Sequence, residues 1–392
     1  MTCSPHIICK LRSLDRGWRD AVNETFRSFY FATEHVFEGD SKLESLVHFP
    51  RLEALILEKE CESPLRDNLD VLRAVSQLKS LALKGFAETD RMLLETIQHM
   101  SFLQELVLVE STEFTDEGLK IISEMPQLKS FSWITSKDVT HFADEVWSNF
   151  KCLEKLAVRL DGASSHLKMQ GISKLPSLHS LMLTTRICPD DFRLLCGMQQ
   201  LKMLSLPFPA VRKADLEYIS QLKELTRLEF MTSVVEFPKW IKSFTKLRHL
   251  KITWSFSAEA GILTEDCLPS LLVCLSLNTF RGPVKDSVFG SLVRLKKLSV
   301  SYVCDVGAKD EASAFGSLCN VEELLICRMH FGCMASLPDI HQMHHLKKLY
   351  IEVNGAVSED YVAKLAKSLK VLKHLTLVSE FSDKHLEYIA QI

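Results

Sequence analysis

Two stretches rich in histidine and cysteine have a spacing that suits metal chemistry. The stretch HQMHH places His341 and His345 four residues apart, so both rings would lie on one face of a helix. The stretch CRMHFGC offers Cys327, His330 and Cys333 as ligands. A structural zinc ion takes four ligands, and neither stretch has an evident fourth ligand or carboxylate partner beside it. We therefore favour solvated helix histidines in the first stretch, and we predict no bound metal and no cofactor.

The motifs of the common catalytic sites are missing from the sequence. There is no GxxxxGK[ST] phosphate loop, no GxGxxG turn after a first strand, no GxSxG elbow and no HExxH helix. The 47 lysines and arginines nearly balance the 50 aspartates and glutamates, which gives a net charge of −3. Such a balance does not provide the field that holds nucleic acid or an anionic membrane. We predict a protein that is not an enzyme and that binds neither nucleic acid nor membrane.

The compartment is indicated by three features of the sequence. No apolar run reaches the roughly 18 residues of a membrane-spanning helix. The first residues, MTCSPHIICKLRSLDRGW, lack the charged start and small-residue cleavage site of a secretory signal. The 12 cysteines are scattered rather than spaced as a disulfide framework, which indicates free thiols. We expect a cytoplasmic or nuclear protein.

One apolar pattern, apolar-x-x-apolar-x-apolar, recurs along the whole chain. In LKKLYI it is formed by Leu346, Leu349 and Ile351. Fifteen copies follow one another at spacings of 22 to 26 residues, counting a weaker aromatic copy that begins at Phe26. So steady a period is typical of a solenoid of leucine-rich repeats.

The spacing within each copy has a physical reason. The last two apolar residues lie two apart, so they point to the same side of a short strand and stack on the neighbouring copies. Each copy buries about three large side chains here, at roughly 1.5–3 kcal/mol apiece before chain entropy is subtracted. One repeat is unstable alone, whereas a stack of repeats is stable.

The second half of many periods predicts a helix. The stretches TDEGLKIISEMPQL, SEDYVAKLAKSLKVL and SDKHLEYIAQI each start with a hydroxyl residue followed by an acid, as helix starts do. The shorter stretch EFPKWIKSFTKL predicts irregular turns in place of a helix. The expected fold is an α/β leucine-rich repeat solenoid, a curved horseshoe with a parallel β-sheet on the concave face and helices and irregular turns on the convex face. We expect an N-terminal cap over residues 1–25 and the repeat domain over 26–392.

Side chains that alternate with the buried pair of each strand form the concave surface. They share no common residue type, whereas the buried set is nearly uniform, and such mixed surfaces suit protein recognition. The candidate partner-binding residues on this surface are Arg159, Arg227, Glu229, Met231, His249, Lys251, Lys297, Lys348 and Tyr350.

The N-terminal stretch CKLRSLDRGWRDAV resembles the closing part of an F-box. Leu11, Leu14, Arg16, Trp18 and Arg19 match the pattern of that motif, which often precedes leucine-rich repeats. The resemblance implies the substrate receptor of a cullin-type ubiquitin ligase. The motif would bind a Skp-type adaptor, and the concave face would select the protein to be ubiquitinated. As an alternative, Leu11, Leu14 and Trp18 form a cap over the exposed core of the first repeat.

A second functional hypothesis uses the same surface. The stretches EFPKWIKSFTKLRHLKI and LPSLLVCLSLNTFRGPV resemble repeats from the sensing end of nucleotide-binding immune receptors. This resemblance implies a stand-alone recognition module of the innate immune type. Both hypotheses predict a curved sheet that binds a protein partner, and they differ in what the binding triggers.

Overall fold

The computed structural model describes most of the chain as two compact units, Met1–Gln200 and Leu201–Ile392. The described residues are 28–32, 51–58, 69–85, 91–110, 116–135, 144–160, 166–187, 189–233, 239–254, 267–280, 286–302, 315, 317–328, 340, 342–380 and 382–390. The candidate cap and F-box-like residues Leu11, Leu14, Trp18 and Arg19 lie outside this set. Within it, no helix is long and apolar enough to cross a membrane.

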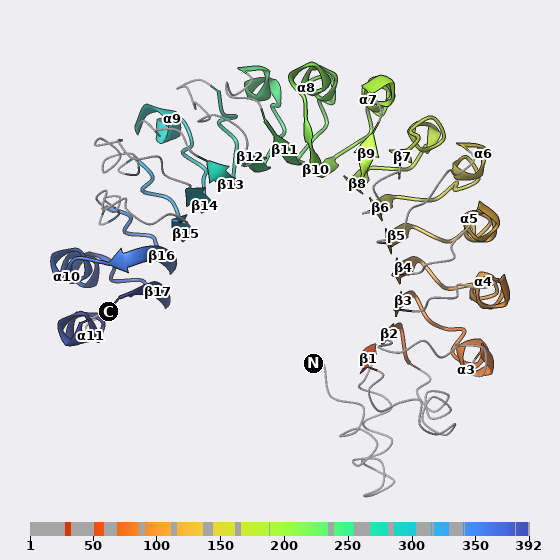
Figure 1. Ribbon diagram of the computed structural model, residues 1–392, viewed down its shortest axis with the longest axis horizontal. Helices are drawn as coiled ribbons and strands as arrows, with labels where there is room; N and C mark the ends of the chain where they lie inside the picture. Colours follow the sequence, from red (N-terminus) through yellow and green to blue (C-terminus); the bar gives the residue numbers. More distant parts are fainter. Residues whose placement is uncertain are drawn as a thin grey trace, which may run out of the picture. The chain divides into compact units, whose positions relative to one another are not determined.

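The first unit contains a parallel sheet in which each strand pairs with the strand of the next repeat (Figure 1). Its strands are β1 (Ser28–Ala32), β2 (Ala54–Glu58), β3 (Ser80–Lys84), β4 (Glu105–Val109), β5 (Ser130–Thr135), β6 (Lys155–Leu160) and β8 (Ser180–Thr184). Two further short strands, β7 (His166–Leu167) and β9 (Arg186–Ile187), pair with each other. The helices are α3 (Leu69–Ala74), α4 (Arg91–Gln98), α5 (Asp116–Ser123), α6 (Asp144–Trp147), the 3-10 helix η4 (Ile172–Lys174) and α7 (Pro189–Leu195).

The second unit repeats the same plan with strands β10 to β17 paired in parallel, each with the next. These strands are β10 (Met203–Val211), β11 (Arg227–Thr232), β12 (His249–Trp254), β13 (Cys274–Phe280), β14 (Lys297–Tyr302), β15 (Glu323–Arg328), β16 (Lys348–Ala356) and β17 (His374–Glu380). The helices are α8 (Lys213–Ile219), the 3-10 helix η5 (Lys239–Ser243), α9 (Asp286–Gly290), α10 (Glu359–Ser368) and α11 (Asp383–Ile389).

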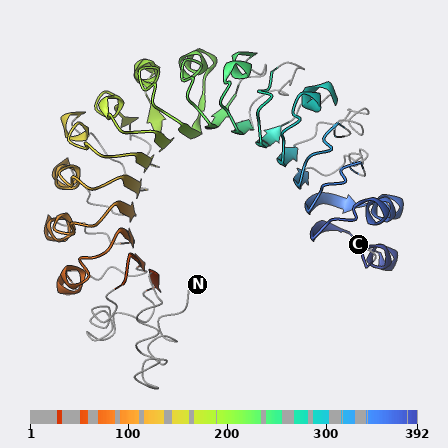
Figure 2. The same cartoon turned by 180° about the vertical axis from the view of Figure 1, so that it is seen from behind.

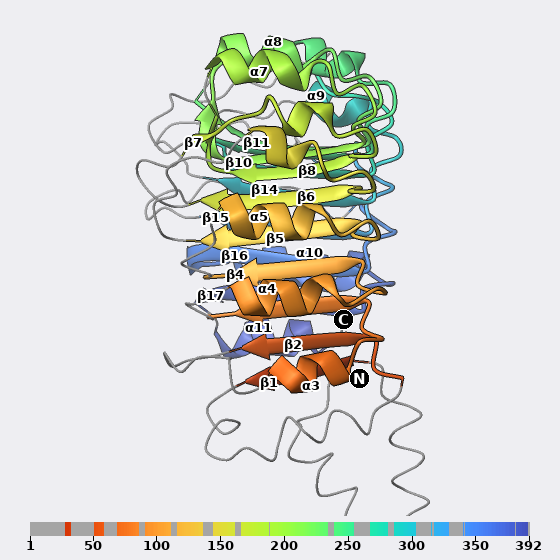
Figure 3. The ribbon, with the colours of Figure 1, turned by 90° about the vertical axis from the view of Figure 1, so that its right-hand side faces the viewer.

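The fold is therefore a leucine-rich repeat solenoid with an all-parallel sheet, as the period predicted. Within each unit the strands line the inner side and the helices the outer side (Figure 2). In the first unit, α3, α4 and α5 stack one above the other on the outer side, in chain order (Figure 3).

The core lies between the strands and the helices, and the predicted leucines fill it. Leu106 and Leu108 of β4 are fully buried, and Leu298 and Val300 of β14 occupy the same places in the second unit. The side chains of β17 alternate between exposed and half-buried, and in the described residues this strand pairs with β16 alone.

The predicted helix starts are confirmed where the structure describes them. In α10, the Ser358 hydroxyl accepts a hydrogen bond from the Tyr361 amide at 3.3 Å, and acidic residues occupy the first turn. In α11, the Ser382 amide donates to His385 Nδ1 at 2.9 Å. The short repeat forms the 3-10 helix η5 instead of an α-helix, in line with the predicted irregularity.

The helical expectation at His345 is wrong. The Leu346 amide donates to the Met343 carbonyl at 3.0 Å, which closes a tight turn just before β16, and His345 lies exposed in this turn. The apolar residue that begins each repeat must turn directly into the strand, so no helical face forms there. His341 lies outside the described residues.

We use the term leading pair for two consecutive residues, the residue directly before a strand and the first residue of that strand. Both amides of a leading pair donate to one carbonyl, that of the residue before the preceding strand. Lys347 N and Lys348 N, for example, donate to Glu322 O at 2.8 and 3.0 Å. This shared acceptor recurs from β11 to β17, so the leading pairs of the second unit lie side by side in a fixed register.

Candidate partner-binding face

The inner face of the second unit contains a groove of about 630 Å³ that crosses β11 to β17. Seven of the nine residues predicted from the sequence line it, namely Arg227, Glu229, His249, Lys251, Lys297, Lys348 and Tyr350. Met231 lies on β11 but does not line the groove, and Arg159 lies on β6 of the first unit. The structure thus brings most of the predicted set into one continuous surface.

The groove has a low floor because small side chains occupy its middle strands. Cys274 and Ser276 lie on β13, and Ser299 lies beside them on β14. On the next two strands, Leu325 and Tyr350 are register partners. Leu325 is 36 % exposed and Tyr350 is half-buried, so an apolar patch adjoins the polar floor.

At the β11 end of the groove, one carboxylate is almost fully buried. Glu229 is only 9 % exposed and forms an ion pair with Lys251 of the neighbouring strand. Arg227 lies two residues before Glu229 on the same strand and is exposed. Among the described residues, no carboxylate forms an ion pair with its guanidinium. This end of the groove therefore presents an unneutralised cation.

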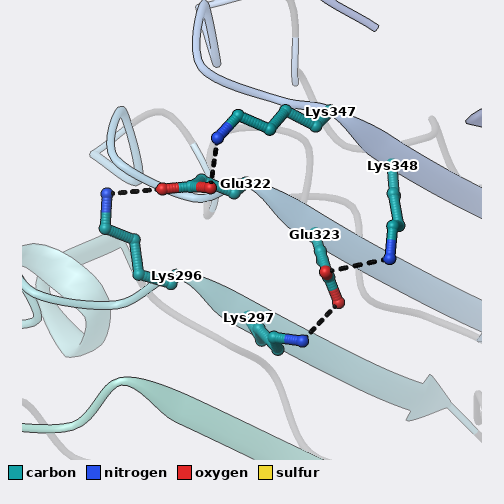
Figure 4. Close-up of polar contacts among 6 residues, drawn as sticks. All are labelled: Lys296, Lys297, Glu322, Glu323, Lys347 and Lys348. Carbon is teal, nitrogen blue, oxygen red and sulfur yellow. Dashed lines mark hydrogen bonds and ion pairs between the residues drawn. The ribbon is translucent and has the colours of Figure 1, made fainter. Parts of the chain in front are cut away.

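On β14, β15 and β16 the leading pairs are Lys296–Lys297, Glu322–Glu323 and Lys347–Lys348 (Figure 4). They form two neighbouring Lys–Glu–Lys sets, which together we call the double triad. The Glu322 carboxylate lies 2.8 Å from Lys296 Nζ and 2.6 Å from Lys347 Nζ. The Glu323 carboxylate lies 2.8 Å from Lys297 Nζ and 3.2 Å from Lys348 Nζ. Each glutamate is therefore bridged by a lysine from the strand on either side.

The double triad shifts the pKa values of its own members. Hydrogen bonds from Lys296 and Lys347 lower the pKa of the Glu322 carboxyl to about 2. The hydrogen bond from Lys297 lowers the pKa of Glu323, and the same contact raises the pKa of the Lys297 ammonium. With four lysines and two glutamates, the double triad has a formal charge of plus two.

The leading pairs of the second unit have a large surplus of positive charge. Their two carboxylates, Glu322 and Glu323, are outnumbered by eight cations. These cations are Lys202, Arg227, Arg248, Lys296, Lys297, Lys347, Lys348 and Lys373. The surplus is thus six positive charges in a chain whose net charge is −3.

The leading pairs of β2 to β8 in the first unit have no such surplus. Three lysines (Lys79, Lys129 and Lys155) are matched by three glutamates (Glu53, Glu105 and Glu154). Lys79 pairs with Glu53 at 3.0 Å, and Lys129 pairs with Glu154 at 3.3 Å. The same positions in the two units therefore differ by six charges.

The first residue of β12, His249, lies within this positive field. Partial desolvation is the largest effect that lowers the pKa of its imidazole, and the nearby Arg227 and Lys297 lower it further. The titratable and charged groups on its own strand and the strands around it are Arg227, Glu229, Lys251, Cys274 and Lys297. His249 is exposed and lines the groove, so an anion bound there would reverse part of this effect.

The cysteines of the groove region are poor nucleophiles. Burial raises the pKa of the Cys274 thiol. Burial and the nearby Glu352 raise the pKa of the Cys327 thiol to about 11. Within the described part of the chain, no three His, Cys, Asp or Glu side chains gather into a group that could hold a metal. His330 and Cys333, the other members of the suggested zinc set, lie outside that part.

Sequence reasoning missed the carboxylates Glu322 and Glu323, their lysine partners Lys296 and Lys347, and the apolar patch residue Leu325. A readable signal existed, because LKKL, VEEL and LKKL place charge doublets directly before the strand in three consecutive repeats. The strand register that sets these doublets side by side follows from the repeat period.

Comparisons with known proteins add little beyond the fold. No family model matches the chain, and no curated protein sequence matches it. Among solved structures, the chain is similar to an internalin of Listeria monocytogenes, with 14 % identity, coverage of 99 % of this chain and 96 % of that chain, and a TM-score of 0.40. It is also similar to a leucine-rich repeat protein of Leptospira interrogans, with 21 % identity, 82 % and 90 % coverage, and a TM-score of 0.46. At these values the fold assignment rests on the strands and helices described above.

Proposed function

We propose that the chain is a non-catalytic recognition scaffold that binds a protein partner on the inner face of its second unit. The observation that carries this proposal is the groove of about 630 Å³, which crosses seven strands and gathers charged, apolar and aromatic side chains. Tyrosine and arginine commonly supply the binding energy of protein interfaces, and Tyr350 and Arg227 both line this groove.

A rigid backbone supports this role. The paired parallel strands and the shared carbonyl acceptors fix where each inner-face side chain begins, so little backbone ordering is needed on binding. The uniform leucine core leaves the inner-face residues free to vary without loss of the fold. A surface built in this way is suited to selecting one partner.

The more specific form of the proposal is the substrate receptor of a Skp–cullin–F-box ubiquitin ligase. Its support is the resemblance of residues 9–22 to the closing part of an F-box. In this form Leu11, Leu14, Trp18 and Arg19 contact the adaptor, and the inner face holds the substrate. The alternative is a stand-alone recognition module of the immune-sensor type, which needs no adaptor, and residues 1–25 then act as a cap.

A capture experiment from eukaryotic cell lysate tests both levels of the proposal. Three forms are compared: the intact chain, a copy lacking residues 1–24, and a full-length Leu325→Ser, Tyr350→Ala variant. A partner that is captured by the first two forms and lost by the third supports recognition on the inner face. Co-capture of a Skp-type adaptor and a cullin by the intact chain alone supports the ligase form. Partners that bind all three forms equally would contradict the inner-face proposal.

A further inference from the structure

We infer that the second unit binds an acidic segment of its partner, one that carries an apolar anchor side chain among its aspartates or glutamates. The inference rests on the proposed function and specifies the chemistry of the partner. The acidic side chains would contact the leading pairs from β10 to β17, and the anchor would contact Leu325 and Tyr350.

The first step is the supply of cations that are available to a partner. Four of the eight leading-pair cations bridge Glu322 and Glu323 in the double triad. The other four, Lys202, Arg227, Arg248 and Lys373, pair with no carboxylate among the described residues, although Arg248 Nη1 donates to the Leu271 carbonyl at 3.3 Å. Lys202, Arg227 and Arg248 belong to strands before the double triad, and Lys373 belongs to the strand after it.

The second step is that the triad itself can exchange partners. The Lys296 and Lys347 side chains are 46 % and 49 % exposed, and Glu322 is 29 % exposed. Ion pairs as exposed as these contribute little and reorganise readily. A partner carboxylate can therefore share a lysine ammonium without any change in the backbone.

The third step is the apolar anchor. Leu325 lies on β15 and lines the groove, where its apolar side chain is exposed to solvent. This exposure does not stabilise the free protein. Its register partner Tyr350 donates a hydrogen bond to Glu352 at 2.9 Å, which holds the ring in place. An apolar side chain of the partner that covers Leu325 and the Tyr350 ring would bury apolar surface beside the charged row.

The pattern favours an acidic peptide over nucleic acid or a lipid surface. Duplex DNA presents one negative charge about every 1.7 Å, without interruption. Glu322 and Glu323 lie in the middle of the basic series and would face such a row of phosphates. A peptide can place neutral residues opposite these carboxylates and acidic residues opposite the lysines on both sides.

The test measures binding of two fluorescein-labelled synthetic peptides to the intact chain by fluorescence polarisation. The anchor peptide has a leucine between two runs of three glutamates, and the plain peptide has serine in place of that leucine. The second-unit variant carries Lys296→Glu, Lys347→Glu and Lys373→Glu. We expect it to weaken binding of the anchor peptide by about tenfold or more at low salt.

The matched control makes the same change at leading pairs of the first unit, Lys79→Glu, Lys129→Glu and Lys155→Glu. We expect less than about a twofold change, because these positions are already charge-balanced. Thermal unfolding of both variants, and of versions with Gln in place of Glu, checks that the fold is retained. Equal weakening by the two triple variants would overturn the inference.

Two further probes at the same salt concentration complete the test, a duplex RNA of equal total charge and phosphatidylserine vesicles. Tighter binding of either than of the anchor peptide, lost in the second-unit variant, would overturn the inference. The proposed function fails separately from the inference. A natural partner that is lost on Leu325→Ser, Tyr350→Ala but retained on the lysine substitutions would leave recognition intact and reject the acidic segment.

Discussion

The two units of the chain share one backbone plan and differ in the chemistry of their inner faces. The leading pairs of β2 to β8 in the first unit hold three cations and three carboxylates, and those of β10 to β17 in the second unit hold eight and two. The residue between the two buried positions of a strand also differs. It is uncharged in every described repeat of the first unit, as at Ala82 and Val107, whereas the second unit has Glu229 and Lys251. The leucines therefore set the architecture, and the alternating residues set the charge of the inner face independently.

The largest expected effect is a loss of stability on truncation of a core leucine, which should be similar in the two units. Leu106→Ala in β4 and Leu298→Ala in β14 each remove a buried side chain, so each should lower the free energy of unfolding by about 2–5 kcal/mol. Chemical denaturation of each variant measures the loss. A cost that is large in one unit and negligible in the other would show that the repeats do not share a common core.

The next prediction concerns whether the charge surplus alone explains why the second unit, and not the first, would bind an acidic peptide. Glu53→Lys, Glu105→Lys and Glu154→Lys would give the leading pairs of β2 to β8 six cations and no carboxylate, the same surplus as in the second unit. We expect this variant to bind a second equivalent of the plain peptide, as measured by titration calorimetry. An unchanged stoichiometry would show that the charge surplus is not sufficient for binding.

A smaller effect isolates the anchor. Leu325→Ser should weaken binding of the anchor peptide by about three- to tenfold and leave the plain peptide unaffected, because only one apolar contact is removed. Leu386→Ser is the matched control, since Leu386 is an exposed leucine on α11 away from the groove. Equal losses for both peptides would assign Leu325 a structural role instead.

A still smaller effect concerns pH and His249. Its pKa is lowered in the free protein, and a bound carboxylate would raise it, so binding should take up a proton. Affinity for the anchor peptide should therefore rise by about two- to threefold as the pH falls from neutral toward the ordinary histidine pKa of about 6.5 and below. The rise should disappear in His249→Gln. A rise of equal size in that variant would assign it to another group.

The smallest effect concerns the double triad. The lowered pKa of Glu322 means that its ion pairs stabilise the fold fully above the ordinary glutamate pKa. This contribution should decline progressively as the pH falls below the ordinary glutamate pKa and be lost at about pH 2. Carboxyl-carbon NMR should show Glu322 still ionised at pH 3.5. A midpoint near the ordinary glutamate value would mean that the lysines do not hold the carboxylate in solution.

The repeat fold was readable from the sequence, because leucine spacing determines strand position and strand pairing follows from stacking. The helix starts at Ser358 and Ser382 were readable for the same local reason, as a hydroxyl residue followed by acids. His345 was misassigned to a helix because a spacing of four residues carries no information about the turn that ends a repeat.

The candidate site was predictable in part. Alternation placed Arg227 and Tyr350 on the inner face, and both line the groove. The depth of the groove depends on small residues such as Ser276 and Ser299 lying between larger ones on flanking strands, which is a property of several repeats together. The bridging of Glu323 by two lysines likewise depends on charge doublets in three consecutive repeats, which the alternation within one strand does not reveal.

Lysine footprinting of the full chain tests the central claim most directly. Acetylation by a small reagent is followed by mass spectrometry, with and without saturating anchor peptide. The compared side chains belong to leading pairs of the two units: Lys296, Lys347 and Lys373 in the second, and Lys79, Lys129 and Lys155 in the first. All of them directly precede a strand except Lys155, which is the first residue of β6. The account predicts protection of the second-unit lysines and unchanged reactivity of the first-unit lysines. Equal protection of both sets, or protection of the first set alone, would contradict it.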